Sequence, residues 1–274
     1  MSTDFRAWIG KCVTRHDRVT PRLVEEYRVT LSPFLFEPGK DVAPPGLHFG
    51  LAPAMPLVQD TGPDGAERKG VFIPPIALPR RMWAGGSIET FHELAVGVDV
   101  SRVSTITDIR FKQGSTGELC LISIQHEISD EQGLAVRERQ DLVYRGVPTS
   151  PPAPIGPLKE TGADWIVDAT PLLLFRFSAL TFNGHRIHYD LAHAAEEGYP
   201  GLLVHGPMQA ALMLNLASVR LGKVPQRFDY RCLAQLFSGA SFGVGYDAAT
   251  TTASIIRSDG VVTAEGQAQA SAVR

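Results

Sequence analysis

The stretch Gly-Leu-Leu-Val-His-Gly-Pro at residues 201–207, followed by the apolar run Met208–Val219, decides the fold. It predicts a buried helix that begins at Gly206-Pro207, because Pro is well suited to the first helical turn. The start of a helix exposes free backbone N–H groups and the positive end of the helix dipole. Gly206 is therefore a candidate donor to an oxyanion, and a glycine there lets a carbonyl oxygen approach closely. The alternative is that Gly206 only eases the turn from loop into helix.

The loop before this helix is Thr-Phe-Asn-Gly-His-Arg-Ile-His-Tyr-Asp at residues 181–190. Its Asn183-Gly184 pair is a strong turn signal and should end the preceding helix. Asp190 can cap a short helix over residues 191–197, which Gly198 then ends. Asn183 and His188 lie five positions apart across the turn. This spacing lets both side chains point into one cleft.

Histidines gather in this part of the chain. Four of the eight, His185, His188, His193 and His205, fall within 21 positions. Histidine is the usual general acid–base group because its pKa lies nearest neutrality. Metal binding by His185, His188 and Asp190 is the first alternative, but the chain has no His-Glu-x-x-His or Cys/His ligand pattern. We therefore expect no metal.

The two halves of the chain have the same order of elements. Thr20-Pro21 and Thr170-Pro171 each open a capped helix, predicted over residues 22–29 and 172–180. Runs rich in Ile, Val and Thr then predict strands in each half. These runs are 103–112, 118–128 and 134–144 in the first half, and 229–234, 241–247, 251–257 and 261–270 in the second.

This shared order predicts an internal duplication, with an N-terminal unit over residues 1–146 and a C-terminal unit over 158–274. The segment 147–157 contains five prolines and is the predicted linker. The alternative is one α+β domain with a long proline-rich loop. The irregular stretch 37–80 is predicted to cover part of a ligand, since long irregular segments are usually functional or mobile.

Composition sets limits on partners and location. The chain has 274 residues, 44% apolar and 20% charged, with a net charge of −3. These values indicate a globular protein without a nucleic-acid surface, although a local basic patch for one anionic ligand is compatible with them. Cys12, Cys120 and Cys232 form no Cys-x-x-Cys pair and suggest a reducing compartment. No apolar run reaches the roughly 20 residues that span a bilayer, so we expect a cytoplasmic protein without membrane contact.

At this point the motifs resemble a known family. Asn-Gly-His-Arg-Ile-His at 183–188, then Asp190 and His205-Gly206, resemble the active-site segment of the MaoC-like hydratases and dehydratases of the hot dog fold. That family has Asp-x-Asn-Pro-x-His, an Asp-capped helix, and His-Gly at the start of a long helix. Here Asn183 replaces the family's Asp, and His185-Arg186 replaces Asn-Pro. The variant sequence resembles the branch of mesaconyl-C4-CoA (3-methylfumaryl-CoA) hydratases and mitochondrial 3-hydroxyacyl-thioester dehydratases.

The resemblance is specific over about residues 170–207 and architectural over the first half. It implies an α+β double hot dog, two copies of an antiparallel sheet wrapped around a long central helix, with a degenerate N-terminal and a catalytic C-terminal copy. It implies a hydro-lyase that adds or removes water at the α,β-double bond of an acyl-CoA thioester, most closely of the mesaconyl-C4-CoA hydratase type. CoA is part of the substrate, and no further cofactor is expected. A monomer is feasible and a homodimer is compatible with the fold.

Two alternatives stay open. One is an (R)-3-hydroxyacyl-thioester dehydratase of fatty-acid metabolism, with an apolar acyl tunnel and no group that binds a carboxylate. The other is a non-catalytic hot dog protein that binds acyl-CoA.

The resemblance also suggests roles for single residues. His188 transfers the proton, Gly206 stabilises the enolate, and Asn183 holds the water, because an amide cannot titrate. Arg186 is a candidate to bind the free carboxylate of a C4-dicarboxylic monothioester. An internal salt bridge of the loop, or contact with a CoA phosphate, are the alternatives for Arg186.

Four further residues are candidates for substrate binding. Tyr189 lies in the 181–190 loop and His205 in the 201–207 stretch. Arg80 and Arg81 follow the irregular stretch and could bind either the substrate carboxylate or a CoA phosphate. The alternative for the arginine pair is solvated surface charge.

Overall fold

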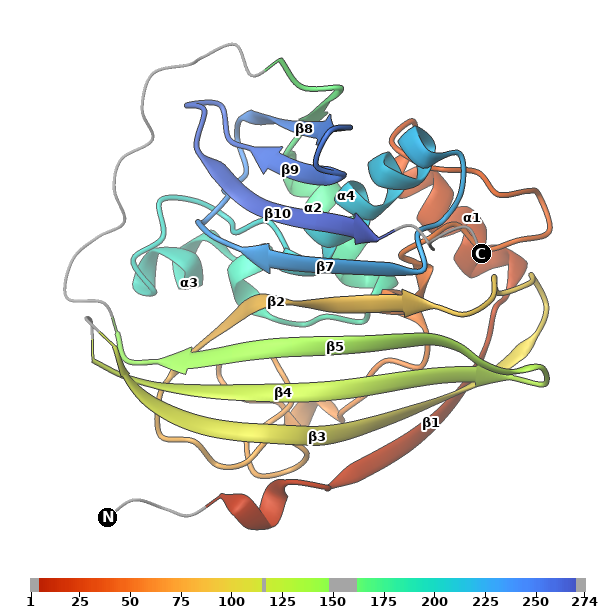
Figure 1. Ribbon diagram of the computed structural model, residues 1–274. Helices are drawn as coiled ribbons and strands as arrows, with labels where there is room; N and C mark the ends of the chain where they lie inside the picture. Colours follow the sequence, from red (N-terminus) through yellow and green to blue (C-terminus); the bar gives the residue numbers. More distant parts are fainter. Residues whose placement is uncertain (1–4, 115–116, 148–161, 270–274) are drawn as a thin grey trace.

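The computed structural model describes residues 5–114, 117–147 and 162–269. They form one ten-stranded antiparallel sheet, in the order β1-β3-β4-β5-β2-β7-β10-β9-β8-β6 (Figure 1). The strands are β1 (Cys12–Arg18), β2 (Arg80–Thr90), β3 (Asp99–Gly114), β4 (Gly117–Asp130), β5 (Gly133–Arg145), β6 (Trp165–Asp168), β7 (Arg227–Cys232), β8 (Ser241–Asp247), β9 (Thr252–Ile256) and β10 (Val262–Gln269). The α-helices are α1 (Pro21–Leu31), α2 (Pro171–Leu180), α3 (Leu191–Glu196) and α4 (Gly206–Leu221).

The strand order repeats. The first five strands lie in the order β1-β3-β4-β5-β2, and the last five lie in the corresponding order β6-β8-β9-β10-β7, so that β2 and β7 meet at the seam. Each half begins with an edge strand and a Thr-Pro helix, whose Thr20 or Thr170 hydroxyl accepts a hydrogen bond from the backbone N–H three residues on. This is the order that a duplicated unit produces. The unit boundaries at 146 and 157 stay predictions, because residues 148–157 of the linker lie outside the described ranges.

Helix α4 forms the core of the second half. Residues 208–218 are all buried, and the helix packs against β8, β9 and β10. A helix that is apolar on all sides is stable only when it is enclosed in this way. It ends at Gly222, whose φ of 70° is the left-handed conformation that suits glycine at a helix C-terminus.

The first half has no counterpart of α4. Between α1 and β2 the described chain contains only the short 3-10 helices Leu47–Gly50 and Val58–Asp60. This long segment is attached to α4 through Asn215, whose amide donates to the Pro45 carbonyl and accepts from the Phe36 N–H. A buried polar residue in the middle of α4 therefore ties the loop of the first half to the core.

Three strands were not predicted from the sequence. β1 and β6 are edge strands, and β1 is polar from Thr14 to Arg18, so it lacks the apolar alternation of a half-buried strand. β2 contains Gly85 and Gly86, which weaken its strand signal. The two neighbouring strands require these glycines, because a Cβ at Gly86 would collide with the Arg139 carbonyl of β5 and a Cβ at Gly85 with the Tyr230 carbonyl of β7.

None of the described helices combines the length and the apolar character that crossing a bilayer requires.

Candidate active site

A cavity of about 980 Å³ lies between the inner face of the first-half strands and the start of α4. Its walls come from the segment around residues 49–73, from β2 to β5, and from the 181–190 loop. Asn183, His188 and Gly206 all line this cavity. The structure thus brings together the three residues that the sequence analysis selected for catalysis.

His188 is held in one orientation by the backbone. It ends the 3-10 helix Arg186–His188, and its Nδ1 lies 2.7 Å from the Leu203 carbonyl oxygen. Because a carbonyl only accepts, Nδ1 carries the proton and Nε2 keeps its lone pair. Burial lowers the pKa of His188 to about 4, although the Leu203 carbonyl opposes the shift. His188 is therefore a neutral imidazole at neutral pH, ready to accept a proton.

His205 supports His188 from behind. The two rings stack, with centroids 3.7 Å apart and planes 19° from parallel. His205 is fully buried, and its Nε2 lies 2.8 Å from the Ser178 hydroxyl oxygen. It is not among the residues that line the cavity. The structure therefore makes His205 a support for the base, where the sequence suggested contact with substrate.

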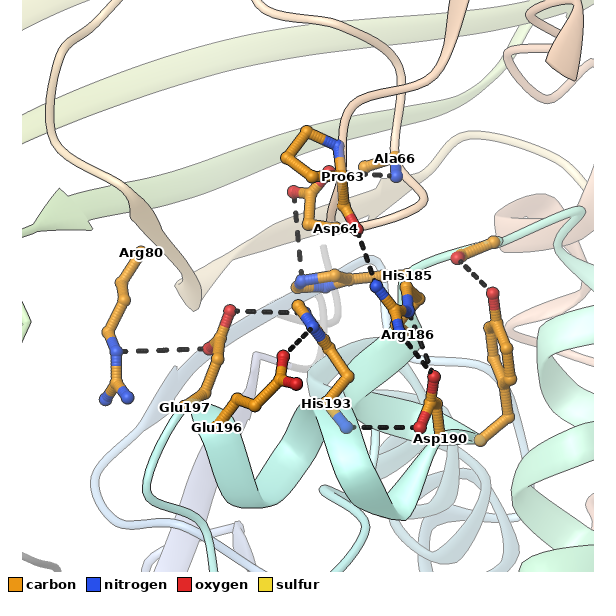
Figure 2. A network of polar contacts seen from close by, with 12 residues as sticks. Pro63, Asp64, Ala66, Arg80, His185, Arg186, Asp190, His193, Glu196 and Glu197 are labelled. Carbon is orange, nitrogen blue, oxygen red and sulfur yellow. Dashed lines mark hydrogen bonds and ion pairs between the residues drawn. The ribbon is translucent and has the colours of Figure 1, made fainter. Parts of the chain in front are cut away.

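His185 is a site residue that the sequence analysis considered only as a metal ligand. It lines the cavity and meets the His188 ring edge-to-face, with centroids 5.5 Å apart. Its Nε2 lies 3.9 Å from an Asp64 carboxylate oxygen (Figure 2). Burial, with the nearby charge of Arg81, lowers the pKa of His185 well below its ordinary value. The sequence contained one indication that His185 belongs to the site, because His185 occupies the motif position where the family has Asn.

Asn183 forms the turn that aims the loop into the cavity. Its backbone N–H donates to the Ser178 carbonyl at the end of α2, and the preceding Phe182 has a φ of 49°. Its Oδ1 accepts a hydrogen bond of 3.0 Å from the His185 N–H, the pattern of an Asx turn. This bond fixes the amide and leaves its NH₂ group as a donor for a molecule in the cavity.

Gly206 is the first residue of α4, so its N–H lies outside the hydrogen bonds within the helix. The reason for glycine here is Trp83 of β2. A Cβ at position 206 would lie 2.9 Å from Trp83 Cβ and 3.0 Å from its Cγ. The Trp83 ring is itself anchored, because its Nε1 donates to the Tyr230 hydroxyl across the seam. The first half of the chain therefore positions the start of the helix in the second half.

Arg186 forms the salt bridge that was one of its three alternatives. Its Nε and Nη2 lie 3.0 and 2.8 Å from one Asp190 carboxylate oxygen (Figure 2). Its Nη1 donates to the Pro63 carbonyl and its backbone N–H to the Asp64 carbonyl. Arg186 does not line the cavity. Arg186 therefore joins the active-site loop to the segment around residues 63–66. Its ion pair with Asp190 was indicated in the sequence by their spacing of four residues, which is typical of ion pairs in helices.

Tyr189 also lies away from the cavity wall. It is exposed, and its hydroxyl donates to the Gly184 carbonyl within the loop.

The two arginines of β2 differ from each other. Arg80 is buried, lies over the Tyr199 ring at 5.0 Å, and has its Nε 3.9 Å from a Glu197 carboxylate oxygen. Arg81 lines the cavity, and its charge contributes to the lowered pKa of His188. Successive residues of a strand face opposite ways, which separates the pair. Of the two, only Arg81 reaches the site.

Within the described ranges, no group of three or more His, Cys, Asp or Glu side chains is arranged to hold a metal ion.

Solved structures place this arrangement in a class. The chain superposes on HtdX of Mycobacterium tuberculosis with a TM-score of 0.70 at 17% identity, over 94% of this chain and 100% of that one. It also matches a second Mycobacterium tuberculosis protein, described as having a double hotdog fold, with a TM-score of 0.53 at 13% identity, over 90% and 88% of the two chains. The double hot dog fold expected from the sequence is confirmed.

The family of hydroxyacyl-thioester dehydratases type 2 matches residues 46–238, and this chain belongs to that family. It is 40% identical over 247 residues to the mesaconyl-C(4)-CoA hydratase of Chloroflexus aurantiacus, which covers 88% of each chain. It is 34% identical over 223 residues to the mitochondrial hydroxyacyl-thioester dehydratase type 2 of Schizosaccharomyces pombe, over 70% of this chain and 74% of that one. The hydratase and dehydratase class expected from the motifs is thus confirmed.

Proposed function

We propose that the protein adds water across the α,β-double bond of an acyl-CoA thioester, and that its substrate is a C4-dicarboxylic monothioester of the mesaconyl-C4-CoA type. The observation that carries this proposal is a neutral His188 in the same cavity as the N–H at the start of α4. The identity of 40% to a mesaconyl-C(4)-CoA hydratase supports the substrate class.

The first role belongs to Gly206. The thioester carbonyl oxygen accepts a hydrogen bond from its N–H, at the positive end of the 16-residue helix α4. Charge that develops on this oxygen as the enolate forms is stabilised by the N–H and by the helix dipole.

The second role belongs to His188 and Asn183. Asn183 holds the water oxygen through its amide NH₂, and His188 Nε2 takes a proton from that water as its oxygen bonds to Cβ. The imidazolium then returns the proton to Cα, which collapses the enolate to the saturated thioester. The same steps in reverse remove water. Because Nδ1 stays bonded to the Leu203 carbonyl throughout, one imidazole serves as base and acid.

Arg81 remains a substrate-binding candidate in this proposal, on the side of the cavity that takes the CoA portion. We also propose a cytoplasmic location, supported by three free cysteines without a pairing motif.

A second function is favoured by one observation. The cavity wall includes the apolar side chains of Phe49, Ile73, Ile124 and Leu142, which suit a longer acyl chain. The family also contains a hydroxyacyl-thioester dehydratase of Schizosaccharomyces pombe. An (R)-3-hydroxyacyl-thioester dehydratase of fatty-acid metabolism is therefore the alternative.

A panel of thioesters separates these functions. The panel contains mesaconyl-C4-CoA, crotonyl-CoA and longer 2-enoyl-CoA esters, and the loss of enoyl-thioester absorbance reports hydration. The proposal predicts the highest kcat/KM for the dicarboxylic thioester. A kcat/KM that rises with neutral chain length supports the dehydratase. Binding of every ester without turnover contradicts both functions and supports a non-catalytic acyl-CoA-binding protein.

A further inference from the structure

A group of polar residues crosses the inner face of the first-half sheet, where α4 has no counterpart. We call it the polar band. The face around it is apolar, with Ile106, Ile128 and Leu142 among its buried residues. Polar side chains in such a place need partners, and they usually serve binding or a specific network. The polar band consists of Arg102 and Ser104 on β3, His126 on β4, and Glu138 and Gln140 on β5.

One part of the polar band is fully paired. His126 Nδ1 lies 2.8 Å from the Ser104 hydroxyl, and its Nε2 lies 2.9 Å from the Gln140 amide oxygen. His126 therefore donates from Nε2 to Gln140 and accepts from the hydroxyl at Nδ1. This network fixes the Gln140 amide and leaves its NH₂ group as a donor, and all three residues line the cavity.

The charged part of the polar band is not fully paired. Arg102 Nη2 lies 3.7 Å from Glu138 Oε2, which is too long for a hydrogen bond. Arg102 Nε and both Glu138 oxygens are buried without a hydrogen-bond partner among the described residues, while Arg102 Nη1 donates to the Leu51 carbonyl. Buried charges are stable only when such groups are satisfied. The Arg102 guanidinium, which lines the cavity, is therefore only partly satisfied by its protein neighbours.

A second guanidinium strengthens the positive charge. Arg15 of β1 lies directly opposite Arg102 in the strand register, and both residues line the cavity. Across the described ranges, the Arg15 side chain has no hydrogen-bond or ion-pair partner, and its charge acts on Arg102. Burial raises the pKa of Glu138 to about 7, so that its neutral form, which does not repel an anion, is accessible near neutral pH. His48, whose Nε2 lies 3.9 Å from Glu138 Oε2, has its pKa lowered by burial to about 3 and stays neutral, and burial with the charge of Glu138 keeps the pKa of Tyr230 well above its ordinary value.

The sheet register places the polar band on the acyl side of the site. Trp83, which touches Gly206, pairs with Leu142 of β5. Gln140 and Glu138 follow two and four residues further along β5, about 7 and 13 Å away at about 3.3 Å per residue. Arg81 pairs with Tyr144, in the opposite direction from Leu142. A thioester whose carbonyl is at Gly206 and whose CoA portion is on the Arg81 side therefore extends its acyl chain along β5 toward Gln140. Arg102 lies further in the same direction, opposite Ile128, which pairs with Val136 of β5, so its long side chain has to reach back toward the acyl group.

We propose that Arg102 and Arg15 bind the free carboxylate of a dicarboxylic acyl thioester, with a further hydrogen bond from the Gln140 amide. This inference rests on the proposed hydratase function and specifies where the free carboxylate binds. A guanidinium matches a carboxylate in shape and charge. The degenerate first half then has a defined task, because it selects the acyl group while the second half carries out the chemistry.

The test compares two substrates that differ by one charge. Mesaconyl-C4-CoA and crotonyl-CoA are assayed with Arg15→Gln and Arg102→Gln. The control is Arg18→Gln, which removes a charge from the same strand, where Arg18 pairs with Asp99 at the surface. We expect kcat/KM for the dicarboxylic thioester to fall by about 10- to 150-fold in each site variant, the range for a lost hydrogen bond to a charged group. For crotonyl-CoA, kcat/KM of the site variants should stay within threefold of wild type, which is on the order of 0.6 kcal/mol. The Arg18→Gln control should leave kcat/KM unchanged for both thioesters.

Folding is checked separately, since Arg102→Gln removes the partner of Glu138. The double variant Arg102→Gln/Glu138→Gln removes both buried charges and should show the same selective loss, as should Arg15→Gln, which leaves no described group unpaired. Equal losses for both substrates in the site variants, or no loss for either, overturn the carboxylate site. If the wild type still hydrates the thioesters in that case, the proposed function stands. A wild type that hydrates neither ester overturns the proposed function and this inference with it.

Discussion

Lowering the pH from 8 to 5.5 protonates an ordinary histidine almost completely, but it should leave His188 neutral. Burial is the main cause of its low pKa of about 4, and the charge of Arg81 adds to the effect. At pH 5.5 about 97% of the His188 side chains are then neutral, compared with about 9% for a pKa of 6.5. Because the reaction begins with a neutral imidazole, kcat/KM should stay nearly constant over this range.

The assay uses crotonyl-CoA, which has no free carboxylate to titrate. Enzyme kept at pH 7.5 is diluted into each buffer, and initial rates are taken before the protein can unfold. Glu138 titrates near pH 7, so the Glu138→Gln variant is measured beside the wild type. An acid limb with an apparent pKa near 6.5 in both proteins, with about a tenth of the activity left at pH 5.5, refutes the assignment of a buried neutral base.

Rapid dilution matters because equilibrium stability and activity should respond differently to acid. Burial lowers the pKa of five histidines in the folded protein below the value near 6.5 that they have when unfolded. Their contribution to stability is fully present above about pH 6.5 and is lost as the pH falls toward the folded pKa values. The five are His48, His126, His185, His188 and His205.

Three substitutions test the structural part of the account. Gly206→Ala brings a Cβ against Trp83, and urea unfolding should show a loss of about 1–3 kcal/mol with a lower kcat; an unchanged midpoint and kcat contradict the close approach. Arg186→Ala removes the Asp190 pair outside the cavity, so kcat/KM should fall by the same factor for charged and neutral thioesters; selective loss of the charged one indicates a carboxylate contact instead. Glu138→Gln removes a group whose pKa is raised to about 7, so the variant should be more stable than wild type by up to about 3 kcal/mol at pH 8. That difference should shrink as the pH falls toward 4.5, and a difference that does not depend on pH contradicts the raised pKa.

Local signals in the sequence were sufficient for much of the fold. The Thr-Pro caps of α1 and α2, the Asn183-Gly184 turn, and the Asp190 cap and Gly198 at the two ends of α3 each act within a few residues, and the structure contains each of them. The alternation of apolar residues in β3, β4 and β5 was equally local. The active-site loop and the helix start that follows it could be predicted because they are nearly contiguous in the chain.

The remaining features depend on contacts between distant parts of the chain. Trp83 of β2 fills the space beside Gly206, more than 120 positions later, and nothing local to either residue indicates this contact. The polar band has the same origin, because strand register brings Arg102, His126 and Gln140 onto one face. The position of Arg186 is set in part by the hydrogen bond from its backbone N–H to the Asp64 carbonyl, and Asp64 lies in a segment whose structure could not be predicted from the sequence.

Replacement of His188 by Gln tests the central claim most directly. The variant keeps a polar side chain of similar size but has no group that titrates near neutrality. Hydration of mesaconyl-C4-CoA should lose about 100- to 10,000-fold in kcat, the range for a removed general acid–base group, with KM changed little. A His188→Gln enzyme that hydrates the thioester at a rate near that of wild type contradicts the account.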